Sequence, residues 1–425
     1  MWVYRIQCSN RKNLLSKMRK IFTVFISLLL ASCLSENSAD PGKGATFIRY
    51  FNGGNNDQAQ ALEETPDKGF IILANTRIQK AEADVPHFKI KLIKTDQFGN
   101  PVWVKLFPPI DDNSKDYTGS GLQLIPTGGY IISGVDIKSS TNKKSLLMTV
   151  GDDGNLVKAA SYGASLSGKA VAVNAAGNFL VLSTSGIQTM RLTEMDKTTL
   201  APVVPADTAI TYGAGQTELT NKLFIDEAGK VLWSGVVTKN GLTGIRMIKT
   251  LPHNINTDFD LLISVPGFDE TASDFCRFGY SYAITGSTNQ KGTTKGTDTD
   301  ILFKRLAPDG TVLSSQSFPF GDGTTPDGQN DVGNSIRSTQ DGGLILLSSV
   351  GSAAIKGNGD TDYYLIKINA FGDKVWSSSF GSRFKDDGVA VLQSSDGGYI
   401  VLGTTTQGAL KLVTLIKTDK NGKVE

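Results

Sequence analysis

Residues 388–403 read GVAVLQSSDGGYIVLG, in which two runs of β-forming residues flank an Asp-Gly-Gly turn. Glycine reaches the positive φ angles that a tight turn requires, so this stretch predicts two antiparallel strands. The same pattern recurs at 66–72, 126–132 and 340–346, and more weakly elsewhere. The second glycine of each copy falls at positions 69, 129, 177, 229, 279, 343 and 398. Intervals of 48 to 64 residues separate these glycines, so the chain is a tandem repeat.

The second half of each copy also recurs, as two further β-rich runs joined by a glycine-containing turn. The clearest examples are residues 88–103, 300–313 and 362–376. Each copy therefore supplies four short strands, and no helical periodicity follows residue 45. Seven such units predict an all-β fold, a seven-bladed β-propeller with four-stranded antiparallel blades. Because the third and fourth copies depart most from the pattern, six or eight blades stay open as alternative counts.

The repeat also predicts how the ring closes. The last copy stops at residue 425 without a fourth strand, whereas residues 45–54 have the strand-four pattern and no hairpin partner. We therefore expect 45–52 to pair with 410–418 as the outer strand of the last blade, because this pairing satisfies an exposed edge. A single propeller domain then spans 45–425. The expected blades are 55–113, 114–164, 165–214, 215–268, 269–322, 323–382, and 383–425 completed by 45–54.

Residues 1–32 have the composition of a secretory leader. They contain six basic residues and no acidic one, and the apolar run at 21–30 is too short to span a bilayer. Both features fit a signal peptide, and Met18 offers an alternative start of better proportions. The leader ends in Leu30-Ala31-Ser32-Cys33, which resembles the lipobox of bacterial lipoproteins.

The lipobox resemblance implies that Cys33 becomes the mature N-terminus and carries a diacylglycerol thioether, with palmitate or a similar chain on its amine. Each buried methylene contributes about 0.8 kcal/mol, so two or three acyl chains hold a protein at a membrane essentially permanently. Leu34 stands where an inner-membrane signal would place Asp, which implies the outer membrane of a Gram-negative bacterium. Residues 33–44 are then a lipidated tether, rich in Ser, Asn, Asp, Pro and Gly.

The propeller repeat itself resembles the Asp-Gly-Gly-Tyr repeat of secreted and surface β-propellers of certain Gram-negative bacteria. The resemblance covers nearly everything after residue 45 and implies the fold. It implies little about activity, because this scaffold hosts many functions.

Charge and cysteine content narrow the function classes. After residue 32 the chain has 37 basic and 41 acidic residues, so it lacks the basic footprint of a nucleic-acid-binding protein. Apart from Cys33, the mature chain contains one cysteine, Cys276, in an expected first strand. We interpret Cys276 as a small buried apolar residue. No disulfide framework and no metal-ligand spacing is present.

Two acidic pairs are the sharpest candidate site. Asp298 and Asp300, and likewise Asp360 and Asp362, precede the third strand of their repeats. We expect these residues to close turns by accepting backbone N–H groups. A calcium site is the alternative, because alternate carboxylates on extended chain point the same way. No other cofactor is expected.

No catalytic motif is apparent. The two histidines, His87 and His253, fall in different copies with no motif nearby. Trp103 and Trp376 share a strand-four position, and together with Trp233 they are interpreted as residues that pack in the blades.

The sequence therefore favours a non-catalytic binding or assembly module, anchored to the outer membrane by its lipid and presenting a propeller face to a protein or glycan partner. One alternative is a glycosidase or lyase that acts on polysaccharide with carboxylates from central loops. The other is a structural subunit of the envelope.

The lipidation of Cys33 is directly testable. Mass spectrometry of the mature N-terminus is expected to find an acylated cysteine at this position, and Cys33→Ser is expected to release the protein from the membrane fraction. An unmodified chain that begins elsewhere, or unchanged fractionation of the variant, would contradict the prediction.

Overall fold

The computed structural model describes residues 46–79, 85–109, 111–139, 142–186, 189–203, 208–211, 217–251, 257–291, 293–320, 329–351 and 359–424. By its internal contacts the chain divides into two units, 1–44 and 45–425, and the described residues belong to the second. Within them, no helix is long and apolar enough to cross a membrane. The predicted leader, Cys33, the tether and His253 lie outside the described residues.

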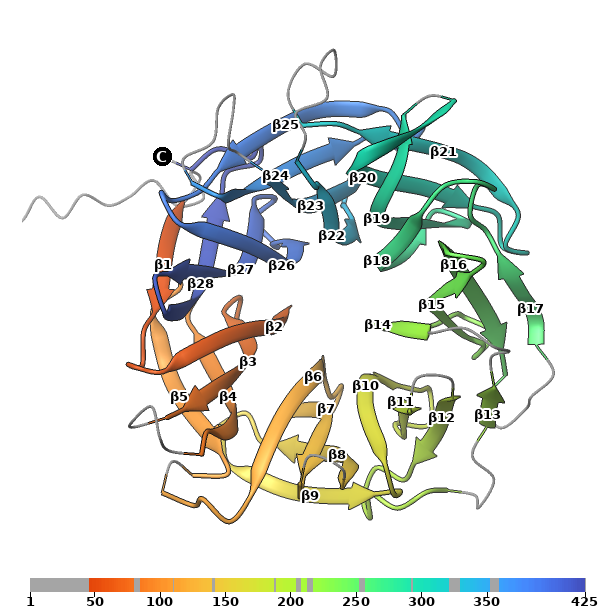
Figure 1. Cartoon of the computed structure of the whole chain (residues 1–425). Helices are drawn as coiled ribbons and strands as arrows, with labels where there is room; N and C mark the ends of the chain where they lie inside the picture. The colour runs from red at the N-terminus through yellow and green to blue at the C-terminus, as the bar shows by residue number, and fades with distance from the viewer. Residues whose placement is uncertain are drawn as a thin grey trace, which may run out of the picture. The chain divides into compact units, whose positions relative to one another are not determined.

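The described strands form seven antiparallel sheets of four strands each, arranged in a ring around a central opening (Figure 1). This confirms the predicted seven-bladed β-propeller and settles the blade count. The first three blades comprise β2 (Asn56–Glu64), β3 (Phe70–Ile78), β4 (His87–Thr95), β5 (Pro101–Phe107); β6 (Asp116–Leu124), β7 (Tyr130–Ile137), β8 (Lys143–Val150), β9 (Leu156–Tyr162); and β10 (Leu166–Val173), β11 (Phe179–Ser185), β12 (Thr189–Met195), β13 (Thr208–Thr211). 

The remaining blades follow the same order from the axis outward. They comprise β14 (Thr217–Ile225), β15 (Val231–Lys239), β16 (Leu242–Thr250), β17 (Thr257–Leu262); β18 (Glu270–Phe278), β19 (Ser281–Lys291), β20 (Thr294–Leu306), β21 (Val312–Phe318); β22 (Val332–Ser338), β23 (Leu344–Gly351), β24 (Thr361–Ile368), β25 (Lys374–Phe380); and β26 (Lys385–Gln393), β27 (Tyr399–Gln407), β28 (Leu410–Thr418), completed by β1 (Phe47–Phe51).

The ring is closed by β1, as predicted. β1 pairs antiparallel with β28, in a register that sets Phe47 opposite Lys417 and Phe51 opposite Val413. Phe47 and Phe51 are buried in a core shared by the last and first blades. The N-terminal strand therefore supplies both the missing edge pairing and part of the core at the closure.

Glycines at the turn between the first and second strands have two separate roles. Gly342 and Gly397 adopt φ angles of 77° and 88°, as the turn requires, and in the first blade Lys68 takes this conformation at 64°. The glycine that follows is needed for space, because a Cβ on Gly343 or Gly398 would overlap a carbonyl oxygen at the end of the third strand. In the Asp-Gly-Gly signature, the first glycine thus provides the positive φ angle, and the second leaves room for the carbonyl oxygen of the third strand.

The aspartate of the same turn forms a repeated ion pair with a lysine near the end of the third strand. Nζ of Lys94 lies 2.8 Å from Asp67, and Nζ of Lys367 lies 2.9 Å from Asp341. Both lysines also donate to the carbonyl of the next residue in their strand, at 2.8 and 3.0 Å. The lysine side chains are buried while the aspartates are exposed. An equivalent pair joins Lys417 to Asp396, and in the fourth blade Lys249 pairs instead with Asp226, the first residue of the turn.

The hydrophobic core lies between the faces of adjacent blades. One cluster combines Leu73 and Leu92 of the first blade with Ile132 and Met148 of the second. Trp103 extends this packing, because its ring meets Tyr130 of the next blade edge-on, with 6.2 Å between ring centroids.

Trp376 meets Tyr399 in the same way at 5.6 Å. Trp233 is 1% exposed, so all three tryptophans pack between or within blades as interpreted.

The turn ion pairs predict a pH-dependent contribution to stability. Burial opposes ionisation of Asp67 and Asp341, but hydrogen bonds from lysine, threonine and the turn N–H outweigh it and lower each pKa from 3.8 to about 2. A carboxyl with a lowered pKa stabilises the folded state above its unfolded pKa, and this contribution is lost as the pH falls from about 3.8 to about 2.

The double variant Asp67→Asn, Asp341→Asn is expected to be less stable than the wild type by about 1 kcal/mol near neutral pH, since both aspartates are largely exposed. The difference should vanish near pH 2 in thermal unfolding. Asp111→Asn, at an exposed position, is the matched control. A difference that persists unchanged to pH 2 would contradict the ion-pair account.

Candidate functional site

Every innermost strand carries a β-bulge at an equivalent place. In each blade the pairing between the first and second strands skips residues, so that the strand next to the axis has extra residues without a partner opposite. Bulges of this kind redirect side chains and often border functional sites. The skipped residues are Gln60, Ser120, Lys169, 220–222, Ser273, Asn334 and Val389.

Small residues precede most of these bulges because adjacent blades come very close near the axis. A Cβ on Gly119 would lie 2.8 Å from a methyl group of Leu73, and one on Gly168 would lie 2.5 Å from the carbonyl oxygen of Gly134. In each case the obstacle belongs to the preceding blade. The close approach therefore excludes larger side chains.

The same residues are also tied to the preceding blade by hydrogen bonds from their backbone. The N–H of Ala59 donates to Thr404 at 3.1 Å, that of Gly119 to Asn75 at 2.7 Å, and that of Gly388 to Ser349 at 2.8 Å. These contacts provide partners near a point where the sheet ladder is interrupted. The bulges are thus fixed by contacts between blades.

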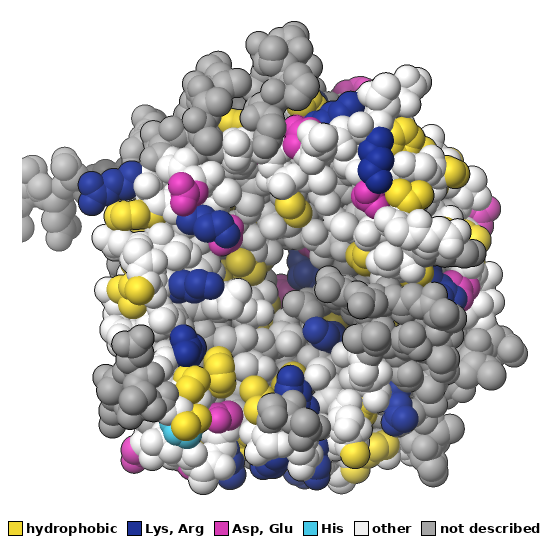
Figure 2. Space-filling model, viewed as in Figure 1, with side chains coloured by type: hydrophobic (Ala, Val, Ile, Leu, Met, Phe, Trp, Pro, Cys, Tyr) yellow, Lys and Arg dark blue, Asp and Glu magenta, His cyan; other side chains and the backbone are white. Residues whose placement is uncertain are grey.

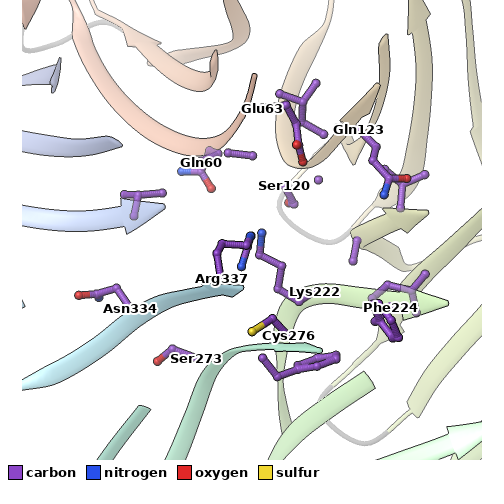
Figure 3. Close-up of a pocket in the computed structure, with 18 of the residues that line it drawn as sticks. Gln60, Glu63, Ser120, Gln123, Lys222, Phe224, Ser273, Cys276, Asn334 and Arg337 are labelled. Atoms are coloured by element: carbon purple, nitrogen blue, oxygen red, sulfur yellow. The ribbon is translucent and has the colours of Figure 1, made fainter. Parts of the chain in front are cut away.

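The bulges surround a central cavity of about 590 Å³ (Figure 3). Residues from the innermost strands of all seven blades line it, and bulge residues of six blades are among them. The polar and charged lining side chains are Gln58, Gln60, Glu63, Ser120, Gln123, Lys222, Ser273, Arg277, Asn334, Arg337 and Ser338. In the space-filling view, basic side chains lie in and beside the hollow at the centre of the ring (Figure 2).

Arg337 is held in the cavity by a buried aspartate from the neighbouring blade. Asp274 directly follows the bulge of β18 and is 1% exposed. Its Oδ2 accepts hydrogen bonds from Arg337 Nη1 at 2.6 Å, from Ser335 Oγ at 2.8 Å and from the N–H of Ile336 at 3.1 Å. Burial disfavours its charged form, but the charges of Arg337 and Lys222 and these hydrogen bonds lower the pKa of Asp274.

Lys222 reaches toward Arg337 from the longest bulge, in β14 (Figure 3). Among the described residues, Lys222 Nζ has no hydrogen bond and no ion pair. Burial, and after it the nearby charge of Arg337, lower the pKa of Lys222.

Glu63 lies on the opposite wall of the cavity, and no contact holds its carboxylate to a described residue. Burial raises the pKa of Glu63, although Lys222 and Arg337 oppose the shift. Charges of both signs thus face one cavity without forming a direct ion pair.

Cys276 is buried, as interpreted from the sequence, at the wall of this cavity. Burial raises its pKa to about 12. Its thiol is therefore neutral at physiological pH and lacks the thiolate form that a nucleophile needs.

The two predicted acidic pairs lie away from this cavity. Asp298 and Asp300 in β20 are buried and face the ammonium group of Lys291, which is 3.5 Å from Asp298 and forms an ion pair with Asp300. Asp362 is buried at the start of β24, whereas Asp360 just before it is exposed. Within the described ranges, no group of three or more His, Cys, Asp or Glu side chains is arranged to hold a metal ion.

His87 likewise lies outside the cavity, where its Nδ1 is 3.1 Å from Asp116 of the second blade.

Sequence reasoning missed the cavity residues, although a weak signal for them exists. Five bulges stand in a small-x-small pattern, such as Gly119-Ser120-Gly121 and Gly388-Val389-Ala390. The pattern locates the positions near the axis. It gives no indication that Lys222 and Arg337 converge, because they come from blades four and six.

Comparisons with known proteins agree with the fold. No protein-family model matches the chain, and no curated protein matches it. The polysaccharide lyase Uly1 is similar in structure, with a TM-score of 0.51 and 10% identity over 91% of this chain and 94% of that one.

Two further solved structures have lower TM-scores. They are an α-L-arabinanase of Penicillium chrysogenum, with a TM-score of 0.48 and 12% identity over 89% and 98% of the chains, and a Bacteroides caccae protein of unknown function, with a TM-score of 0.42 and 15% identity over 73% and 95%. At these identities the likeness concerns the fold alone.

The Asp274–Arg337 pair predicts coupled effects on stability. Asp274→Asn is expected to lower the free energy of unfolding by roughly 1–3 kcal/mol, less than a fully buried pair would lose, because the Arg337 side chain is 27% exposed. Arg337→Gln in the same background should then cost less than it does in the wild type, as denaturant unfolding can measure. Strictly additive effects would show that the two residues are not energetically coupled.

Proposed function

We propose that this chain is a non-catalytic binding module whose propeller receives a ligand in its central cavity, and that a lipid on Cys33 holds it at the outer membrane of a Gram-negative bacterium. The observation that carries the binding proposal is Lys222. Its ammonium group projects into the polar cavity at the axis without a partner among the described residues, beside the guanidinium of Arg337 that Asp274 holds in place. An unpaired charge in such a place is costly unless a ligand compensates it.

The size and shape of the cavity support the same proposal. A volume of about 590 Å³ falls within the range of roughly 300–1,000 Å³ that is usual for small-ligand sites. Seven blades fix its walls, and hydrogen bonds between blades hold the bulges in place. A preformed site of this kind binds a ligand with little loss of conformational freedom.

A carboxylate-based glycosidase or lyase is the second candidate. Such a glycosidase needs two carboxyl groups about 5–10 Å apart that face the same substrate. Among the described lining residues Glu63 is the single carboxylate exposed to the cavity, since Asp274 is buried behind Arg337. The geometry therefore favours binding over hydrolysis. The third candidate, a purely structural envelope subunit, does not explain why the ammonium group of Lys222 lies in the cavity without a partner among the described residues.

The test uses the full chain in detergent, applied to arrays of oligosaccharides and peptides and assayed for turnover of the same compounds. Binding of one ligand class without turnover is expected, and Gln60→Ala should weaken it at unchanged melting temperature. If the wild type turns over one of these compounds and Glu63→Gln abolishes this turnover, the chain is an enzyme. If no compound binds, the structural candidate is favoured.

A further inference from the structure

The central cavity is basic within a chain that is otherwise slightly acidic. Residues after position 32 include 37 basic and 41 acidic side chains. Among the described residues that line the cavity, three are basic, namely Lys222, Arg277 and Arg337, and Glu63 alone is acidic. A cavity with this bias attracts anionic groups, and its low-dielectric walls strengthen the attraction.

Two of these basic groups keep free hydrogen-bonding capacity. Within the described residues, Arg337 donates to Asp274 and to the carbonyl of Ile336 through Nη1 alone, so Nε and Nη2 of its guanidinium have no hydrogen-bond partner there. Lys222 Nζ has no partner in the described part of the chain. Arg277 differs, because Glu227 lies 3.3 Å from it. An anionic group between Lys222 and Arg337 would relieve their mutual repulsion and gain charge-assisted hydrogen bonds.

The remaining polar lining consists of side-chain amides and hydroxyls. Gln60, Ser120 and Ser273 are bulge residues whose side chains have no hydrogen bond within the described ranges. Amides and hydroxyls can both donate and accept, which matches the hydroxyl groups of a sugar. A simple inorganic anion would leave these groups without a role.

A second hollow of about 360 Å³ shares the lining residue Gln58 with the central cavity. Arg77 and Lys411 line this hollow, together with Phe88, and its described lining contains no acidic residue. β3, which ends after Arg77, and β28, which begins next to Lys411, place this hollow where the first and last blades meet. Basic groups thus continue from the axis toward the rim, which fits a chain of several anionic units.

We propose that the cavity binds an acidic oligosaccharide, with a carboxylate or sulfate group seated between Lys222 and Arg337 and further acidic units extending toward Arg77 and Lys411. This inference rests on the proposed binding function and names the class of its ligand. The negative charge of the ligand is recognised at the axis, and the amides and hydroxyls of the bulges bind its sugar hydroxyls.

The experiment titrates the full chain in detergent with four probes: an oligogalacturonate of about six units, a chondroitin sulfate oligosaccharide, a neutral cello-oligosaccharide of similar length, and inorganic sulfate. At least one acidic oligosaccharide is expected to bind about tenfold or more tightly than both the neutral chain and the free sulfate. Its affinity should fall as the ionic strength rises.

Variants locate the contacts. Lys222→Met should weaken binding of the acidic oligosaccharide about tenfold or more, because it removes a charge-assisted hydrogen bond, whereas Lys420→Met at an exposed turn should leave it unchanged. Glu63→Gln should strengthen binding severalfold by removing a repulsive carboxylate. Arg77→Gln should weaken binding of the long oligosaccharide and leave that of a single galacturonate unchanged.

The outcomes separate the two proposals. A neutral oligosaccharide that binds as tightly as the acidic ones, with binding lost in Gln60→Ala, keeps the binding function and overturns the acidic ligand. If inorganic sulfate binds as tightly as the acidic oligosaccharides, the cavity recognises a free anion, and the proposal of an acidic oligosaccharide is also overturned. Unchanged affinity in Lys222→Met at a normal melting temperature overturns the proposed position of the anionic group. Absence of binding by all four probes overturns the acidic ligand, and the binding function falls as well only if the oligosaccharide and peptide arrays also show no binding.

Discussion

Seven sheets converge on one axis, and the close approach of their innermost strands is the constraint on which the rest of this structure depends. Where Gly119 faces Leu73 and Gly168 faces the backbone of Gly134, there is no room for a side chain. Small residues at these positions let the blades meet, and the neighbouring bulge absorbs the extra residue in the strand. The ring and the lining of its cavity therefore have one physical origin.

The cavity is polar because many of the bulge residues that line it carry polar side chains. Gln60, Ser120 and Ser273 have no partner opposite them in the second strand, and their polar side chains line the cavity. A small residue follows the bulge in five blades, whereas blade four carries Leu223 there and blade five carries Asp274. Its buried carboxylate fixes Arg337 of the next blade, so a single substitution in one repeat orients the charge of another.

Stability and function are consequently distributed differently along each repeat. The turns and outer strands hold the blade through elements that recur, such as the pair of Lys367 with Asp341 and the packing of Trp376 on Tyr399. The axial bulges differ from blade to blade. Repetition thus supplies a rigid ring, and divergence at a few axial positions gives it an asymmetric, charged interior.

The blade and the ring could be predicted from the amino-acid sequence. Asp-Gly-Gly turns and paired β-rich runs are local patterns that depend on positive φ angles and on pairing between strands close in the sequence. The closing strand at 45–52 pairs over a long distance in the sequence, but it could be predicted because the last repeat lacks a fourth strand. The candidate site, in contrast, could not be predicted from the sequence and depends on the folded ring. Lys222, Arg337 and Glu63 belong to three different blades and are far apart in the sequence, and no periodicity relates them. Their convergence depends on ring closure and on the unequal bulge in β14, which shifts Lys222 into the cavity. The acidic pairs were visible in the sequence because they occupy the same position in two repeats. The charged residues at the axis were not, because each occurs in one repeat only.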